Sequence, residues 1–130
     1  MENLDKFNRI AITVFSRCYS VFPIECSFSY DEFFDNKNSK DEEIFYTSFF
    51  LLERYGYIIK TNNTIGTGLI DGVLLTEKAL HILNCTPSSL KEQCSIGEKV
   101  SLAAKEGTKI AFTEAAKLVM QYGVAFFSHM

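Results

Sequence analysis

The sequence predicts a mostly α-helical fold with a small β-hairpin, followed by a long C-terminal helix. Three observations predict this fold. Apolar residues recur at helical spacing over residues 4–21, capping motifs headed by serine or threonine open later segments, and residues 57–75 are rich in strand formers and glycine. The chain has 130 residues, 47% hydrophobic and 22% charged, which is ordinary for a globular protein and excludes bulk disorder.

The first predicted element is a helix that begins near Leu4 and ends before Pro23, with its apolar side chains on one face. Apolar and polar residues then alternate over 24–28, which predicts a short strand. Ser29 and Glu32 have the spacing of a capping box, in which each side chain binds a free backbone N–H of the other. We therefore expect a short helix to follow the strand.

A third, stronger helix is predicted after the polar loop that follows. The capping box formed by Ser39 and Glu42 opens it, and it ends at Tyr55, where Gly56 can adopt the left-handed conformation of a helix cap. The glycine-containing hairpin comes next, with strand-forming residues at both its ends. Thr76 caps a further helix that reaches about residue 84.

This order of elements resembles a winged-helix domain over residues 4–84. The segments LLERYGYI (51–58) and GVLLTEKALHIL (72–83) carry the resemblance. They are similar to the Leu-x-x-x-Gly-aromatic-Ile entry to the wing and the Leu-Thr-x-x-Gly/Ala-x-x-x-Leu exit from it. The resemblance implies a winged-helix-like domain over 1–87, whose third helix and wing commonly contact DNA.

The rest of the chain, residues 88–130, is predicted to be a helical extension. Ser95 and Glu98 form another capping box, from which a single helix can run over 96–122, roughly 40 Å at 1.5 Å per residue. Small residues recur every four positions on one face, which would let another helix approach closely. We expect this face to pack on the domain or on a dimer mate, so that the protein self-associates through Ala103, Gly107, Ala111 and Ala115.

The predicted third helix has the wrong charge for a DNA reader. Residues 25–54 contain eight acidic side chains against three basic ones, a net charge of −5 that would repel phosphates. On a helical wheel the outward side also carries aromatic rings, which suit a protein-binding surface and a basic partner. The predicted protein-binding residues are Asp41, Glu42, Glu43, Tyr46, Phe50 and Glu53. The alternative, DNA binding, would use Lys37, Lys40, Arg54 and Lys60.

The sequence predicts no catalytic site, metal site or cofactor. Phosphate-binding glycine loops, nucleophile elbows and zincin motifs are absent. His81 lies inside a predicted helix, where we expect a structural or surface role, and His129 lies next to the terminus. The four cysteines lack the CxxC spacing of zinc sites, and we expect them to be reduced thiols. No signal-peptide pattern or apolar run of about 20 residues occurs, so we expect a cytoplasmic protein without an integral membrane segment.

These observations predict a non-catalytic, winged-helix-like protein that acts by binding another protein through an acidic, aromatic-containing surface. A toxin-neutralising immunity protein or a regulatory adaptor would fit that description. The alternative is a dimeric winged-helix transcriptional regulator. A third hypothesis is a peripheral membrane or adaptor subunit that works through residues 96–127, where basic side chains oppose an apolar face.

Overall fold

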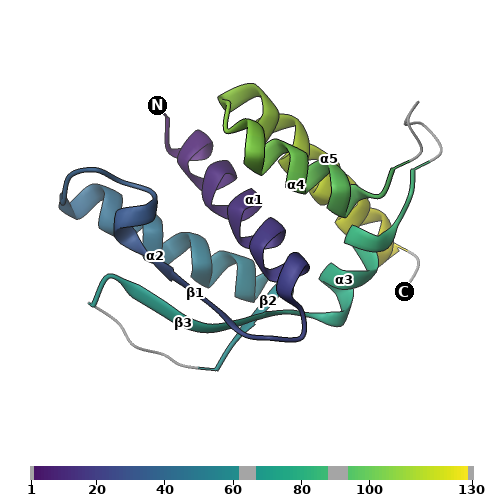
Figure 1. Cartoon of the computed structure of the whole chain (residues 1–130), viewed down its shortest axis with the longest axis horizontal. Coiled ribbons are helices and arrows are strands. Elements are labelled where there is room, and N and C mark those ends of the chain that lie inside the picture. The colour runs from purple at the N-terminus through teal and green to yellow at the C-terminus, as the bar shows by residue number, and fades with distance from the viewer. Residues whose placement is uncertain (1, 62–66, 88–93, 129–130) are drawn as a thin grey trace.

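The fold is organised around its first helix, α1, which lies between two groups of elements (Figure 1). The computed structural model describes residues 2–61, 67–87 and 94–128, with side chains described through residue 123. One group holds α2 and a small sheet, and the other holds α4 and α5, both of which also contact α3. The helices are α1 (Asn3–Val21), α2 (Ser39–Arg54), α3 (Glu77–Asn84), α4 (Ile96–Glu106) and α5 (Lys109–Ser128).

The sheet has three antiparallel strands rather than the two of a simple hairpin. They are β1 (Cys26–Ser29), β2 (Ile58–Lys60) and β3 (Leu69–Leu75), and β3 lies in the middle. Ile58 pairs with Leu75 in the hairpin, and Cys26 pairs with Val73 on the other side. The prediction of a mostly helical chain with a small β-hairpin and a long C-terminal helix is confirmed. The short strand predicted over 24–28 is present as β1, over 26–29, and completes the sheet.

Aromatic rings fill the core between α1, α2 and the sheet. Phe28 of β1 lies 5.5 Å from Phe49 of α2, which in turn lies 5.2 Å edge-on to Phe45, measured between ring centroids. The same buried cluster continues into Ile96 of α4 and Val119 of α5. The C-terminal helices therefore share one hydrophobic core with the segment 1–87 and pack on it in cis.

The short helix expected after β1 is only one 3₁₀ turn, η1 (Tyr30–Glu32). The predicted capping box between Ser29 and Glu32 is present, but the chain does not continue as an α-helix. Aromatic rings in and after η1 pack against other rings instead. The ring centroid of Phe33 lies 6.0 Å from that of Phe45, and the ring of Tyr30 stacks on that of Phe34 with a centroid distance of 5.0 Å. Tertiary packing thus overrides the local helix signal.

The single helix expected over 96–122 is two helices that form an antiparallel hairpin. Gly107 ends α4 with a φ of +70°, and its backbone N–H donates to the carbonyl of Ala103. The hydroxyl of Thr108 then accepts a hydrogen bond from the N–H of Ala111 and caps the start of α5. A left-handed glycine followed by a capping threonine reverses the chain within two residues.

Within the described ranges, no helix is both long enough and apolar enough to span a bilayer.

Candidate functional site

Helix α2 packs one side into the core and leaves one narrow face exposed. Phe45, Ser48, Phe49 and Leu52 are buried. On the opposite side, exposed residues follow one another at intervals of three or four, the spacing of a single helical face. We call this face the outer stripe of α2; it consists of Lys40, Glu43, Thr47, Phe50 and Arg54. Phe50, with 52% of its surface exposed, is the large apolar side chain of this stripe.

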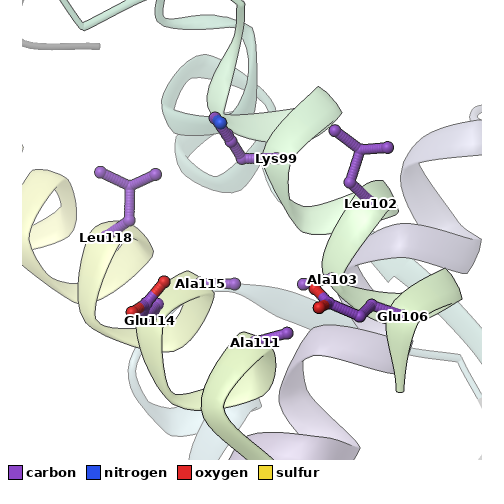
Figure 2. Close-up of a pocket in the computed structure, with 8 residues that line it drawn as sticks. All are labelled: Lys99, Leu102, Ala103, Glu106, Ala111, Glu114, Ala115 and Leu118. Atoms are coloured by element: carbon purple, nitrogen blue, oxygen red, sulfur yellow. The ribbon is translucent and has the colours of Figure 1, made fainter. Parts of the chain in front are cut away.

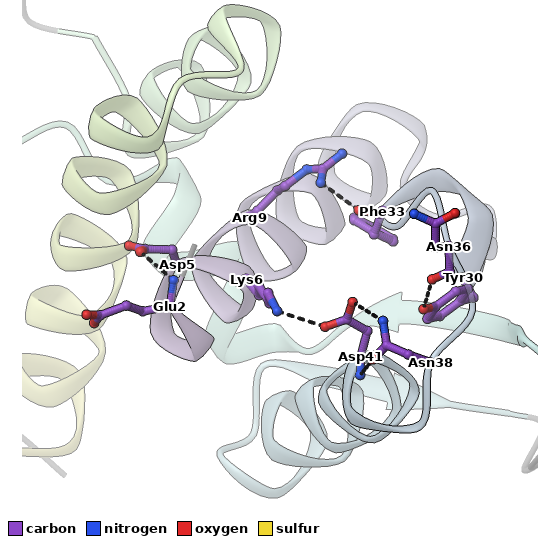
Figure 3. Close-up of polar contacts among 9 residues, drawn as sticks. All are labelled: Glu2, Asp5, Lys6, Arg9, Tyr30, Phe33, Asn36, Asn38 and Asp41. Atoms are coloured by element: carbon purple, nitrogen blue, oxygen red, sulfur yellow. Dashed lines mark hydrogen bonds and ion pairs between the residues drawn. The ribbon is translucent and has the colours of Figure 1, made fainter.

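The first predicted binding residue, Asp41, is held within the molecule. Its carboxylate forms a 2.8 Å ion pair with the Nζ of Lys6 on α1 and accepts a 2.9 Å hydrogen bond from the side-chain amide of Asn38 (Figure 3). The hydrogen bond from Lys6, and then that from Asn38, lowers the pKa of Asp41. Asn38, not Ser39, is the N-cap of α2, because its side chain accepts the Asp41 N–H at 2.8 Å. Asp41 therefore fixes α2 on α1 rather than facing a partner.

Basic side chains of α1 pair with two acidic residues of the segment 25–54, Asp41 and Glu32. Arg17 forms a 2.7 Å ion pair with Glu32, and Arg9 donates a 2.6 Å hydrogen bond to the carbonyl of Phe33 (Figure 3 shows Arg9). Burial opposes ionisation of Glu32, but hydrogen bonds from Arg17 and from the Ser29 N–H outweigh it and lower the pKa of that carboxyl. The surface around α2 is consequently less acidic than the sequence alone indicates.

Two more predicted binding residues attach α2 to the β-hairpin. The hydroxyl of Tyr46 accepts a 2.6 Å hydrogen bond from the N–H of Gly68, just before β3. The carboxylate of Glu53 accepts a 3.2 Å hydrogen bond from the N–H of Lys60 and lies 3.9 Å from its Nζ. Tyr46 is half-buried and packs edge-on against Phe45, so the expectation that it points outward is wrong.

The remaining predicted residues divide between exposed and partly covered positions. Glu43 is exposed on the outer stripe, and Glu42 beside it is half-buried. Tyr55 has 49% of its surface exposed because α2 ends there. Its carbonyl accepts a 2.8 Å hydrogen bond from the Nζ of Lys78, whose pKa burial lowers. Tyr55 is thus an exposed aromatic residue at the end of α2, beyond the outer stripe.

The basic residues of the DNA-binding alternative are not gathered at one point. Lys40 and Arg54 are exposed at the two ends of the outer stripe, about 21 Å apart along the helix axis at 1.5 Å per residue. Lys37 is exposed in the loop before α2, whereas the side chain of Lys60 is only 14% exposed beside Glu53. Glu43 lies on the same stripe, between Lys40 and Arg54.

The small residues of the C-terminal region line a groove between α4 and α5 with a volume of about 400 Å³ (Figure 2). Ala103, Ala111 and Ala115 are buried at its floor, whereas Gly107 is exposed in the turn. The face of small residues that was predicted on one continuous helix is therefore divided between α4 and α5, which face each other. The other lining residues, which the sequence did not single out, are Lys99, Leu102, Glu106, Glu114 and Leu118.

The described part of the chain shows no group of three His, Cys, Asp or Glu side chains placed to hold a metal ion. Cys18 and Cys26 are buried free thiols, and Cys85 donates to the carbonyl of His81. Burial raises the pKa of Cys18, so this thiol stays protonated at neutral pH.

Of the predicted protein-binding residues, Glu43 and Phe50 lie on the outer stripe of α2. Its exposed aromatic ring is Phe50, and Glu43 and Arg54 lie on either side of it. The sequence signal for this stripe is the spacing of its residues by three or four positions, which places them on one face of a helix. Comparison of the chain with protein-family models, curated proteins and solved structures gives no match.

Proposed function

We propose that this protein acts without catalysis by binding another protein through the outer stripe of α2. The observation that carries the proposal is the half-exposed ring of Phe50 on a helix anchored at both ends. Asp41 fixes the first turn of α2 to α1, and Glu53 fixes the last turn to β2. An aromatic side chain on a rigid helix loses little conformational freedom when a partner covers it, and aromatic residues dominate interface hot spots.

The chemistry of the stripe describes the partner. Phe50 would enter an apolar pocket, and the flanking Glu43 and Arg54 would form the polar rim. A basic group on the partner would lie opposite Glu43, and an acidic group opposite Arg54. Small non-catalytic proteins with one such surface suit the role of a toxin-neutralising immunity protein or a regulatory adaptor.

We also propose that residues 4–84 form a winged-helix-like unit. The pairing of β1 with the hairpin supports this proposal, because the short strand after the first helix then belongs to the same sheet as the predicted wing. So does the position of α2 directly before the hairpin, attached to it through Tyr46 and Glu53. The single turn of η1 stands where the resemblance implies a second helix, and this is the clearest departure.

A DNA-binding regulator is the second candidate function. The observation in its favour is that Lys40 and Arg54 share the outer stripe with Thr47, so two cations could reach phosphates from one helix face. Glu43 on the same face opposes it by repelling phosphate. The two candidates predict opposite effects of charge reversal at Glu43: Glu43→Lys weakens protein binding and strengthens DNA binding.

Quantitative affinity purification tests the protein-binding proposal. The wild-type chain, Phe50→Ala and Glu43→Lys are immobilised in parallel, with Ile24→Ala as the control because Ile24 is also strongly exposed but lies outside α2. We expect at least one protein to be retained by wild type and Ile24→Ala and lost from both α2 variants. Equal retention by all four proteins contradicts the proposal. A gel shift at low salt that Glu43→Lys strengthens would favour the DNA-binding candidate instead.

A further inference from the structure

We propose that the thiols of Cys18 and Cys26 form a reversible disulfide bond when the protein meets a small oxidant, and that this bond clamps α1 to β1. The inference does not depend on the function proposed for α2. Cys18 lies in the last turn of α1, and Cys26 is the first residue of β1. Both are free thiols in the core, with 2% and 7% of the residue surface exposed, respectively.

The turn between α1 and β1 brings the two cysteines to the same level. The N–H of Ile24 donates a 2.9 Å hydrogen bond to the carbonyl of Val21, so the chain reverses directly after α1 and leads into β1, which contacts α1 (Figure 1). Cys18 lies three residues before Val21, about 4.5 Å along a helix. Cys26 lies two residues after Ile24, about 6.6 Å along a strand. Because both residues face the core, their side chains lie between α1 and β1.

The residues next to the two cysteines hold α1 and β1 together. Arg17, beside Cys18, donates a 3.1 Å hydrogen bond from Nη1 to the carbonyl of Ser27, beside Cys26. Burial raises the pKa of the Cys18 thiol, and the neighbouring Cys26 thiol raises it further. Two cysteines on contacting elements can be bridged with little backbone movement. The fold thus holds these two thiols as a pair.

The exposure of the two thiols sets the order of the reaction. Cys26 is the more exposed thiol and lies on an edge strand, so hydrogen peroxide reaches it first. Its sulfur attacks the peroxide, the O–O bond breaks, and the thiol proton leaves with hydroxide as water, which converts Cys26 to a sulfenic acid. Cys18, which its raised pKa keeps protonated until then, performs the second step.

In the second step the Cys18 sulfur attacks the sulfur of the sulfenic acid. The S–S bond forms, the S–O bond breaks, and the Cys18 proton leaves with hydroxide as a second water. One peroxide is thus reduced to two waters while two thiols are oxidised to one disulfide. Low-molecular-weight thiols reverse the reaction by exchange and are themselves oxidised to a disulfide.

The clamp would stabilise the fold and leave the proposed binding surface unchanged. The disulfide closes a covalent ring over residues 18–26, which restricts the unfolded chain. Helix α2 is fixed to α1 through Lys6 and Asp41, near the opposite end of α1 from Cys18. Oxidation therefore strengthens the link between α1 and the sheet without acting on the outer stripe.

Peptide mapping of the full wild-type chain tests the bond. The reduced protein is treated with hydrogen peroxide in an excess that fully oxidises free cysteine in the same solution. Remaining thiols are then alkylated, and the peptides are analysed by mass spectrometry without reduction. We expect Cys18 joined to Cys26, and both recovered as thiols after dithiothreitol. Recovery of both as alkylated thiols after peroxide, or their joining to Cys85 or Cys94 instead, overturns the proposal.

Variants in a Cys85→Ser, Cys94→Ser background test the order of the two steps. This background should form the same disulfide as wild type. Adding Cys18→Ala should accumulate a sulfenic acid at Cys26 that dimedone labels, whereas adding Cys26→Ala should leave Cys18 unlabelled. Circular dichroism verifies that each variant is folded. Any other labelling pattern in folded variants overturns the assigned order.

Urea unfolding tests the clamp. Peroxide treatment should raise the unfolding midpoint of the wild-type chain, and dithiothreitol should return it to its original value. The same treatment should not shift the midpoint of the Cys18→Ala variant. An oxidised wild-type chain that contains the mapped bond but unfolds at the midpoint of the reduced chain overturns the clamp.

Discussion

The backbone N–H of Gly68 donates a 2.6 Å hydrogen bond to the hydroxyl of Tyr46, which ties the start of β3 to the middle of α2. About two turns further along α2, Glu53 accepts the N–H of Lys60 at the end of β2. The hairpin is thus attached to the helix at both of its strands. Phe50 lies between these two attachment points in sequence and remains half exposed, which makes the outer stripe a fixed surface rather than a mobile one.

Loss of the Tyr46 hydroxyl should weaken this attachment without changing the outer stripe. We expect Tyr46→Phe to lower the free energy of unfolding by about 1 kcal/mol, the usual net contribution of one hydrogen bond. Urea unfolding measures the change. Tyr55→Phe is the matched control, because Tyr55 is half exposed and the substitution should change stability by less than about 0.5 kcal/mol. Equal effects of the two variants would show that the Gly68 contact contributes nothing.

Stability should fall at acidic pH as the Asp41 carboxylate becomes protonated. The pKa of Asp41 is lowered in the folded protein, first by the hydrogen bond from Lys6, so the folded state favours the ionised form. Its contribution is present above the unfolded pKa, near about 4, and is lost as pH falls through the lower folded value. Glu32, also with a lowered pKa, acts in the same direction.

A series of urea unfolding curves between pH 7 and about 2.5 tests this dependence. Asp41→Asn cannot titrate, so its stability should decline less steeply at acidic pH than that of the wild-type chain. Asp35→Asn is the control, because Asp35 is an exposed acid in the loop before α2, whereas Asp41 is the acid that pairs with Lys6. Parallel wild-type and Asp41→Asn curves would contradict the prediction.

The turn between α4 and α5 should require glycine for its backbone conformation rather than for space. Gly107 has a φ of +70°, and an added Cβ would meet no atom within 4 Å. We therefore expect Gly107→Ala to lower the free energy of unfolding by about 1 kcal/mol, and Gly107→Asn to cost less because asparagine tolerates this region better. Thermal unfolding ranks the three proteins. Equal stability of the alanine and asparagine variants would contradict a conformational cause.

The contact between α4 and α1 should require glycine for space. A Cβ on Gly97 would lie 2.5 Å from Cε2 of Tyr19, whose hydroxyl donates to the side-chain oxygen of Asn84. Gly97→Ala should therefore destabilise the protein by about 1–3 kcal/mol, as overpacking does. In a Tyr19→Leu background the same substitution should cost clearly less, because the ring that it meets is gone. An unchanged cost in that background would place the strain elsewhere.

Local sequence signals predicted the elements well where each signal lies within one element. The spacing of apolar residues located α1, and the Thr76 side chain caps α3 as expected, accepting the N–H of Ala79. Gly56 has the predicted left-handed conformation after α2, with a φ of +83°. Such features depend on neighbours within one helical turn, so the sequence contains most of what determines them.

The candidate site was harder to predict because its partners are distant in sequence. Lys6 and Asp41 are 35 residues apart, so counting charges over 25–54 could not show that α1 compensates that segment. A helical wheel likewise placed Tyr46 outward, because it contains no information about the hairpin that covers it. The break at Gly107 and Thr108 did have a local signal, since glycine commonly ends a helix and threonine commonly begins one.

The central claim is that Phe50 contacts a partner protein. A photo-crosslinking phenylalanine derivative placed at position 50 of the full chain, and irradiated in cells, measures this contact directly. The control carries the same group at position 24, which is also strongly exposed and lies outside α2. We predict a discrete crosslinked protein from position 50 that is absent from position 24 and is lost when Glu43→Lys is added. The same products from both positions, or crosslinks from position 50 to nucleic acid alone, would contradict the claim.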